Sequence, residues 1–460
     1  MGSIPVLEGL LQDLVGKKFT KKVILDYYYT SGKKPEDFLI GMEVEKIGVY
    51  RKTGETVPYF GDKGFLKILE KLNHELGWNI DDKSNDAIFA MSRNGTHLTL
   101  ESDGRIELSG KTHKNIHDLA REFRLHQNEI NEISSIFGVT WLGIGFHPFS
   151  SNKDLEMIPK TRIRISTDYL KHKGKQGESW SQRTASVQAA VDYKDEADAM
   201  RKFQLLNRMT PALMAMYANS PLMLGKKSNY LSYRGYCTLN TDNDRFGSFP
   251  DFFTKGFNFE KWVEFCLDVP IITILRKGEW LPIKSLTFRQ FMKTGFRGYR
   301  AGMEDWLMHI SFMYTDVRVK NYLEYRACDS VPPHLVPSLP ALLKGLLYNE
   351  QSLAAAEELF KDWEFKDIKK LKQEVVKTAL QTPFRDKKIV DWAKQVLEIA
   401  TDGLKKQAVL DVDGRDESIY LQPLKEIIMV RGISPAAYAL ERWEGEWNGE
   451  ISKLTDWCAY

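Results

Sequence analysis

The stretch Ile40-Gly41-Met42-Glu43-Val44-Glu45-Lys46 places two glutamates within a run of apolar residues that is typical of a buried strand. Side chains two residues apart on a strand lie on the same face, so Glu43 and Glu45 should point in one direction. An ionised carboxylate is costly to bury without a partner. One face of this strand therefore needs a neutralising group, and a hard divalent cation is a natural candidate.

A second pair of glutamates, Glu101 and Glu107, flanks a turn within Ser102-Asp103-Gly104-Arg105. If Asp103-Gly104 formed a two-residue turn, the two glutamates would lie on opposite faces of the hairpin. A three-residue turn over 102–104, with Gly104 in the left-handed conformation, would place both on one face. We expect this second register, with all four glutamates facing the same cavity.

Two interpretations of this acidic face fit the pattern. Like charges at close range raise each other's pKa, and bound Mg²⁺ or Mn²⁺ would remove that conflict. Alternatively, the strands are half exposed and the glutamates face solvent, as alternating strands often do. The pattern alone supports the two interpretations equally.

The amino-acid composition limits the classes of protein to which this chain can belong. The chain has 460 residues, of which 43% are hydrophobic, which is enough for a large core. Its 65 Lys and Arg nearly balance its 62 Asp and Glu, and it has no basic block, so we expect no nucleic-acid partner. No apolar run is long enough to span a bilayer, and the N-terminus does not resemble a signal peptide, so we expect no membrane partner.

The four cysteines are widely separated and lack the spacing of a zinc site. They are Cys237, Cys266, Cys328 and Cys458. We expect four free thiols in a reducing compartment, and therefore a cytoplasmic protein.

Hydrophobic periodicity divides the chain into strands and helices without a regular β-α-β rhythm. The predicted strands cover Phe38–Tyr50, Ala87–Ser92, Thr96–Glu101, Arg105–Ser109, Thr140–Phe146, Arg183–Tyr193 and Lys320–Arg326. The predicted helices cover Val6–Leu14, Gly64–Leu76, Ile116–Phe137, Asp195–Tyr217 (kinked or split at Pro211) and almost all of Pro340–Trp443. This order favours an α+β fold with a mostly antiparallel sheet.

No long linker divides the sequence. We therefore expect residues 1–460 to form a single catalytic domain. A sheet-containing core should occupy about 36–330, and a C-terminal helical segment of about 340–450 should pack on it.

Two further stretches carry polar faces. On a strand starting at Arg183, the side chains of Ser186 and Gln188 would share one face with Ala190 and Asp192, although an ordinary half-buried strand looks the same. The stretch 318–326 would present Arg318, Lys320, Tyr322, Glu324 and Arg326 on one face. That face suits either solvent or a phosphate site with one metal ligand, because arginine matches phosphate oxygens bidentately.

Together these features indicate a metal–nucleotide site built from side chains. The sequence has no Walker loop and no dinucleotide fingerprint that would supply a glycine-rich phosphate site instead. Phosphoryl transfer by positioning and charge neutralisation fits this description.

An ordered set of motifs over about Ile40 to Trp447 resembles the plant and proteobacterial branch of the glutamate–cysteine ligases. Each motif is weak alone, and their order is specific. The motifs are Ile40–Gly48, Leu100-Glu101 with Glu107–Gly110, Leu142–Pro148, Ala218–Pro221, Tyr230–Arg234, Asp242–Arg245, Leu267–Pro270, Thr287–Phe291, Glu324–Arg326 and Thr382–Asp386.

This resemblance implies a glutamine-synthetase-like fold, in which a curved, mostly antiparallel sheet forms a funnel with helices outside. It implies that the γ-carboxylate of glutamate is phosphorylated by ATP and that the amine of cysteine then displaces phosphate. This reaction is the first step of glutathione biosynthesis. ATP would be the co-substrate and Mg²⁺ (or Mn²⁺) the cofactor.

The resemblance also assigns roles by position. The metal-binding carboxylates would be Glu43, Glu45, Glu101, Glu107 and Glu324, with Gln188 beside them. Arg183 and Arg234 would hold the glutamate substrate, and Arg326, helped by Arg318, would contact the ATP phosphates. Glu43, Glu45 and Arg326 would form the catalytic centre.

The sequence departs from the family pattern near the expected substrate pocket. Ser102-Asp103-Gly104-Arg105 replaces the usual Pro-Gly-Gly-Gln, and Ala190 replaces an Asn. Thr238 and Asn240 stand where the family has Trp and Asp. These changes leave the metal face intact and leave the identity of the amine open.

Three alternatives therefore accompany the glutamate–cysteine ligase. A γ-glutamyl or other carboxylate–amine ligase would use a different amine. A small-molecule kinase would stop at phosphoryl transfer, and a non-catalytic binding protein would not turn nucleotide over. The expected partners are small-molecule substrates, with the chain acting as a monomer or homodimer.

Overall fold

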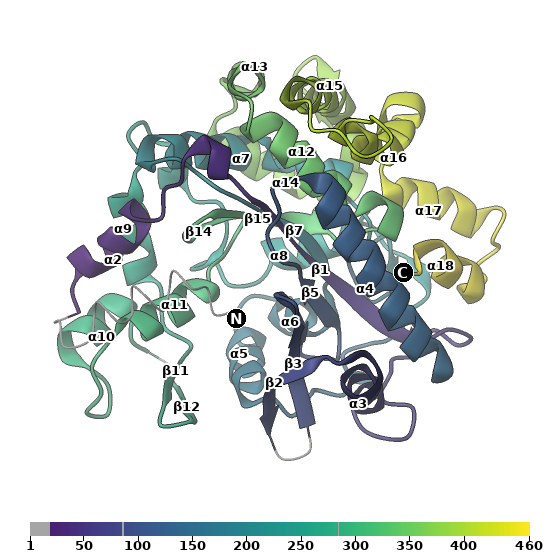
Figure 1. Ribbon diagram of the computed structural model, residues 1–460, viewed down its shortest axis with the longest axis horizontal. Helices are drawn as coiled ribbons and strands as arrows, with labels where there is room; N and C mark the ends of the chain where they lie inside the picture. The colour runs from purple at the N-terminus through teal and green to yellow at the C-terminus, as the bar shows by residue number, and fades with distance from the viewer. Residues whose placement is uncertain (1–18, 85–86, 284) are drawn as a thin grey trace.

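The computed structural model describes residues 19–84, 87–283 and 285–460, so the helix predicted over Val6–Leu14 lies outside the described residues. Figure 1 shows a central sheet with the long helix α4 (Ile116–Ile136) along it and the C-terminal helices gathered at the top and right. The polar faces predicted from the sequence lie on the strands of this sheet.

The main sheet has nine strands, and every pairing within it is antiparallel. Its order is β14 (Val317–Val319), β15 (Leu323–Asp329), β7 (Ser186–Val191), β1 (Ile40–Tyr50), β5 (Ile106–Ser109), β4 (Thr96–Leu100), β3 (Ala87–Arg93) and β2 (Asn79–Ser84), with β6 (Val139–Leu142) also paired to β1. The strands do not close into a barrel. The predicted α+β class with an antiparallel sheet is confirmed.

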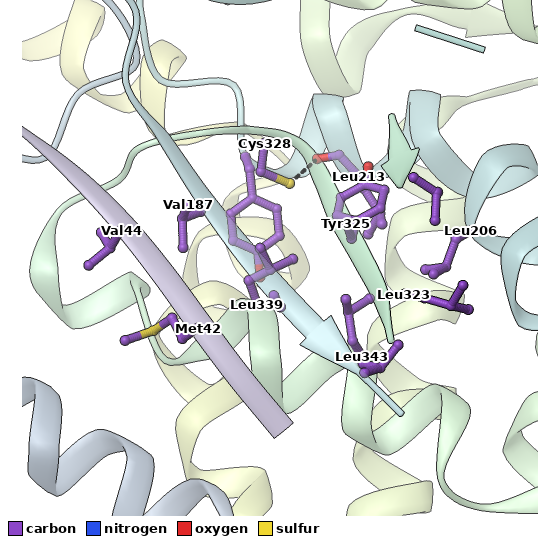
Figure 2. Packing of buried hydrophobic residues seen from close by; sticks show 14 of the residues in the cluster. Met42, Val44, Val187, Leu206, Leu213, Leu323, Tyr325, Cys328, Leu339 and Leu343 are labelled. Carbon is purple, nitrogen blue, oxygen red and sulfur yellow. Dashed lines mark hydrogen bonds between the residues drawn. The ribbon is translucent and has the colours of Figure 1, made fainter. Parts of the chain in front are cut away.

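One face of this sheet is apolar. Val44, Val187 and Tyr325 lie on three neighbouring strands, and each is fully buried. Figure 2 shows them packed with Leu213 of α7 (Glu196–Met216) and Leu339 of α12 (Ser338–Leu347). Because side chains alternate along a strand, the polar residues between these apolar ones must point to the opposite face.

The remaining helices surround this core, with α12 against β7 and α14 against α7. The helices before α12 are α2 (Lys21–Tyr29), α3 (Phe65–Leu76), α5 (Thr161–Lys171), α6 (Gly177–Arg183), α8 (Tyr233–Leu239), α9 (Phe259–Asp268), α10 (Phe288–Thr294) and α11 (Met303–Ser311). Those after α12 are α13 (Glu350–Phe360), α14 (Phe365–Thr378), α15 (Ile389–Gln407), α16 (Gln422–Lys425), α17 (Pro435–Glu444) and α18 (Ile451–Cys458).

Four short two-stranded ribbons lie outside the main sheet. They are β8 (Leu222–Met223) with β9 (Lys226–Lys227), β10 (Phe246–Gly247) with β13 (Tyr314–Thr315), β11 (Thr273–Arg276) with β12 (Glu279–Pro282), and β16 (Pro383–Phe384) with β17 (Lys387–Lys388). Of these four ribbons among the described residues, the pair β10 and β13 is parallel, and β13 ends two residues before β14 begins.

Three sequence predictions need correction. The strand predicted over Arg183–Tyr193 begins at Ser186, because Arg183 is the last residue of α6. The single strand predicted over Lys320–Arg326 is a hairpin, in which β14 ends at Val319 and β15 begins at Leu323. The helix predicted to be kinked or split at Pro211 is not split, because α7 is continuous through that residue.

No helix among the described residues is both long and apolar enough to cross a membrane. The four cysteines are buried and free, as expected.

Candidate functional site

The hairpin between β4 and β5 sets the register of the acidic face. The Glu101 N–H donates to the Arg105 carbonyl at 2.9 Å, and the Gly104 N–H donates to the Glu101 carbonyl at 3.1 Å. Gly104 has a φ of 85°, which is the left-handed conformation that glycine favours. The three-residue turn over 102–104 is therefore confirmed.

This register aligns the carboxylates across neighbouring strands. Thr99 pairs with Glu107, and Thr99 lies two residues before Glu101, so both glutamates share one face. Glu107 also lies directly opposite Glu45 on β1. The prediction that these glutamates share a face is confirmed.

The same face continues across β7 and β15. Glu43 lies opposite Gln188, and Ala190 lies opposite Glu324. Since Gln188 and Ala190 are two residues apart on β7, their neighbours Glu43 and Glu324 point to the same side of the sheet. The fifth predicted carboxylate therefore joins the first four on one face, with Ala190 among them.

The centre of this face brings like charges together. Glu45 and Glu107 are cross-strand partners, a placement at which like charges destabilise a sheet. Burial raises the pKa of Glu107 well above its ordinary value, and the charges of Glu43, Glu101 and Glu45 raise it further. Burial also raises the pKa of Glu45. The fold therefore holds these carboxylates together at a cost in stability.

Arg105 partly neutralises this acidic centre, a role that the sequence analysis missed. Its Nε donates to Asp103 Oδ1 at 2.6 Å, and its Nη1 lies 3.7 Å from Glu45 Oε2. Both Arg105 and Asp103 are buried. The sequence did hold a signal for this residue. Arg105 lies two residues before Glu107, and side chains at that spacing in an extended segment lie on the same face.

The opposite end of the face is cationic. Glu324 accepts hydrogen bonds from Lys320 Nζ at 2.9 Å and from Arg326 Nη1 at 3.0 Å, and Arg318 Nη2 lies 2.5 Å from its Oε2. Burial would raise the pKa of Glu324, but these three cations hold it below its ordinary value. Glu324 is therefore ionised beside a cluster of positive charge.

A β-bulge directs Arg326 toward the centre of the sheet. The register of β15 against β7 shifts between Tyr325 and Cys328, so that Arg326 and Ala327 together lie opposite Gln188. The Arg326 guanidinium donates to the Gln188 side-chain oxygen and to Glu324. Bulges commonly redirect a side chain near a functional site.

The structure places Arg183 on a helix and not on a strand of the sheet. Arg183 ends α6, and its guanidinium lies 4.2 Å from the centre of the Phe146 ring. It donates to the His147 carbonyl at 3.1 Å, while its buried Nε has no hydrogen-bond partner among the described residues. Burial lowers its pKa to about 10. Its predicted role as a substrate ligand stays a prediction.

Arg234 reaches the cationic end of the face from α8. Its guanidinium donates to the carbonyls of Ala327 at 3.2 Å and Arg326 at 2.9 Å. Ser232 caps α8 by accepting from the Gly235 N–H at 2.9 Å, and it donates to the buried carboxylate of Asp329. The cap fixes the start of the short helix that carries Arg234.

Two positions that depart from the family pattern lie on or just after α8. The Thr238 hydroxyl donates to the Arg234 carbonyl at 3.0 Å, and the Asn240 amide donates to the Tyr236 carbonyl at 2.9 Å. Both side chains therefore bond back to main-chain carbonyls four residues earlier, on the helix that carries Arg234. Within the part of the chain that the structure describes, neither side chain forms a hydrogen bond to a carboxylate of the sheet.

Within residues 19–84, 87–283 and 285–460, no three His, Cys, Asp or Glu side chains converge as a ready-made metal cage. The carboxylates are instead spread along the face as pairs. Their oxygen atoms and their mutual repulsion fit Mg²⁺, which typically binds one or two protein carboxylates and completes its shell with water and phosphate.

The sequence matches known proteins over most of its length. Residues 39–456 match the model of glutamate–cysteine ligase family 2. A chloroplastic glutamate–cysteine ligase of Medicago truncatula is 32% identical over 446 residues, which cover 96% of this chain and 85% of the relative. The Arabidopsis thaliana counterpart is 31% identical over 444 residues, with coverages of 96% and 83%.

The fold also matches a solved structure. The crystal structure of a Francisella tularensis glutamate–cysteine ligase in complex with AMP superimposes with a TM-score of 0.57 at 14% identity. The match covers 93% of this chain and 88% of that chain, and it supports the fold. On the family model and the plant relatives together, the chain belongs to glutamate–cysteine ligase family 2.

Proposed function

We propose that this protein uses ATP to join the γ-carboxylate of glutamate to the amine of cysteine through γ-glutamyl phosphate, the first step of glutathione biosynthesis. The observation that carries the proposal is the continuous polar face from Glu101 to Arg326. It runs across neighbouring strands and changes from acidic to cationic along its length. A metal–nucleotide substrate carries the complementary charges, because its metal ion is positive and its phosphates are negative.

The acidic half of the face is suited to Mg²⁺. The ions, when bound, would offset the charge of the ATP phosphates and of the moving phosphoryl group. The proposed ligands are Glu43, Glu45, Glu101, Glu107 and Glu324. Arg105 would limit repulsion at Glu45 while the site holds no ion.

The cationic half is suited to anionic substrate groups. Arg326, held by Glu324 and Gln188, would contact the phosphates, with Arg318 behind it. Arg234 would bind a carboxylate of the glutamate substrate, because its own hydrogen bonds reach only neutral carbonyl groups. Arg183 has a buried, unpartnered Nε and is the second proposed glutamate ligand.

Product analysis tests this proposal. The protein is incubated with ATP, Mg²⁺, glutamate and a mixture of amino acids, and the products are identified by mass. We expect γ-glutamylcysteine as the main product. Another γ-glutamyl amide would identify a different amine, a stable phosphorylated product would indicate a kinase, and absence of nucleotide turnover would contradict the proposal.

Two further expectations stay proposals. A cytoplasmic location is consistent with four free buried thiols, although the plant relatives named above are chloroplast proteins. A monomer or homodimer remains the expected assembly.

A further inference from the structure

Asp329, the last residue of β15, has a buried carboxylate to which the proposed function gives no role. Its Oδ2 accepts from the Asn219 N–H at 2.9 Å and from the Ser220 hydroxyl at 2.7 Å. Its Oδ1 accepts from the Ser232 hydroxyl at 2.9 Å. All three donors are neutral, so among the described residues no cation forms a hydrogen bond to this carboxylate.

Each of the two serine hydroxyls also accepts a hydrogen bond from the first turn of α8. Ser220 Oγ accepts from the Arg234 N–H at 3.1 Å, and Ser232 Oγ accepts from the Gly235 N–H at 2.9 Å. A hydroxyl has one proton, and a backbone N–H can only donate. Each serine must therefore give its proton to Asp329 and turn a lone pair toward α8. The carboxylate, which only accepts, sets the direction of both hydrogen-bond relays.

Arg234 is held at its main chain and at its side chain. Its N–H reaches Ser220, and its guanidinium donates to the carbonyls of Arg326 at 2.9 Å and Ala327 at 3.2 Å. These two carbonyls belong to the β-bulge of β15, and Asp329 lies two residues beyond it. Nη1 of Arg234 lies 3.9 Å from Asp329 Oδ1, which is too long for a hydrogen bond but close enough for attraction between the charges. Asp329 therefore acts on both ends of Arg234.

Three motifs of the family resemblance meet at this carboxylate. They contribute Gly145, Ser220 and Ser232, none of which has a role in the proposed function. A Cβ at Gly145 would lie 2.5 Å from Asp329 Cγ, so the close approach of the two segments requires glycine. Packing as well as hydrogen bonding therefore fixes the place of the Asp329 carboxylate.

A buried carboxylate is a costly way to join these segments. Neutral donor and acceptor pairs could link them without taking a charge out of water. An asparagine in place of Asp329 would have nearly the same size, but its amide nitrogen would donate. That nitrogen would have to face Ser232, since the Asn219 N–H already points at the other oxygen. The Ser232 proton would then lose its acceptor, and the cap of α8 would be weakened.

We propose that Asp329 is a positioning residue, which orients the hydroxyls of Ser220 and Ser232 and thereby holds Arg234 against β15 in its binding orientation. The inference rests on the proposed function, because it takes Arg234 as a ligand of the acid substrate. Asp329 acts through this arginine and needs no contact with the substrate.

Steady-state kinetics of Asp329→Asn test this role, with hydroxylamine as the nucleophile because it traps the acyl phosphate whatever the natural amine. We expect the KM for glutamate to rise about 20-fold or more, since a misplaced Arg234 loses a charged hydrogen bond to the acid. The KM for ATP should change by less than about threefold, because Arg326 keeps its hydrogen bonds to Gln188 and Glu324. A purely structural role would lower kcat and leave both KM values unchanged, and that result would overturn the assignment.

A double-mutant cycle tests whether Asp329 acts through Ser232. Ser232→Ala alone should raise the KM for glutamate by less than Asp329→Asn does, because the relay through Ser220 remains. If the two residues belong to one relay, the protein with both changes should have a KM within about threefold of that of Asp329→Asn. Effects that multiply would show independent roles and overturn the relay. Ser220→Ala and Ser232→Ala preserve the test if Asp329→Asn does not fold, and an unchanged KM for glutamate in both would refute the role.

A matched control is Glu417→Gln, which changes another buried carboxylate into its amide. Glu417 is fully buried and accepts from Lys344 Nζ at 2.6 Å and from the Ile116 N–H at 2.5 Å. This variant should lower the Tm and leave both KM values within about threefold of wild type. An equal rise in the KM for glutamate in Glu417→Gln and Asp329→Asn would show that lost stability alone explains the effect.

The crystal structure of the Asp329→Asn protein separates this inference from the proposed function, because it needs neither substrate nor turnover. We expect the Arg234 guanidinium to leave the carbonyls of Arg326 and Ala327. A wild-type protein that forms no γ-glutamyl product would refute the proposed function, whereas a displaced Arg234 would still support the positioning role. An Arg234 that keeps both hydrogen bonds in the variant would refute that role even in an active ligase.

Discussion

At the scale of single residues, the acidic face is placed for chemistry at the expense of stability. Glu45 and Glu107 face each other across two strands, and burial with neighbouring charges raises the pKa of Glu107. An apolar or neutral residue at either position would relieve this repulsion. Such an exchange should therefore raise the free energy of unfolding, although it removes a functional carboxylate.

The change Glu107→Gln tests this trade-off. Loss of the carboxylate should lower ATP turnover about 100-fold or more, because charge stabilisation in the transition state is lost. The same change should raise the Tm at neutral pH, since it removes one of several like charges. Steady-state rates and thermal unfolding measure the two effects.

The stability gained by Glu107→Gln should depend on pH. The pKa of Glu107 in the folded protein exceeds the ordinary value of 4.5, so the folded state binds the proton more tightly than the unfolded state. Stability from this group is complete below that ordinary value and is lost as the pH rises through the folded pKa. The variant should therefore gain stability over wild type with increasing pH, and Mg²⁺ should raise the Tm of wild type more than that of the variant. A variant less stable than wild type at pH 7 would contradict the repulsion.

At the scale of elements, the turn over 102–104 fixes which face the second glutamate pair occupies. A Cβ at Gly104 would lie 2.0 Å from Phe65 Cε2, and the φ of 85° is unfavourable for other residues. The turn therefore needs glycine for two independent reasons. One is the backbone conformation, and the other is the packing against α3.

The change Gly104→Ala should destabilise the protein by about 3 kcal/mol, combining the left-handed strain with the steric clash. Gly278→Ala is the matched control, because Gly278 has a φ of 80° and a Cβ added there would meet nothing within 4 Å. It should cost only about 1 kcal/mol. Urea unfolding compares the two, and equal costs would show that contact with Phe65 does not matter.

The sequence predicts a strand or helix correctly where the hydrophobic period and the turn residues indicate the same structure. The glutamate strands follow a period of two, and Gly104 marks their turn. The hairpin between β14 and β15 escaped prediction because its connection, Lys320-Asn321-Tyr322, has no glycine or proline and keeps the alternation of a strand. Helix α6 has seven residues, too few to show an apolar stripe, so Arg183 was assigned to a strand.

The buried ion pair of Asp316 with Lys372 escaped prediction for another reason. Asp316 and Lys372 are 56 positions apart, and Lys372 lies in a helix that reads as an ordinary amphipathic segment. Only tertiary packing brings this lysine to the carboxylate. Sequence periodicity shows which face a residue occupies but does not show which distant residue meets it.

At the scale of the whole molecule, the two faces of the sheet have different roles, one in packing and one in the candidate site. The apolar face packs on α7 and α12, and this burial stabilises the strands despite the repulsion on the polar face. The C-terminal helices also supply Lys372 of α14, which forms a buried ion pair with Asp316 between β13 and β14. We therefore predict that the sheet and the C-terminal helices unfold together.

The change Leu343→Ala tests this cooperativity. Leu343 of α12 is fully buried and belongs to the same hydrophobic cluster as Leu323 of β15, as Figure 2 shows. Truncation should cost about 2–5 kcal/mol through lost burial and a residual cavity. Because the helix and the sheet share this core, both circular dichroism and tryptophan fluorescence should show one transition at a lower temperature. Val412→Ala, at a side chain that is 97% exposed, should leave that temperature unchanged, and two separate transitions with only one shifted by Leu343→Ala would show that the C-terminal helices fold independently.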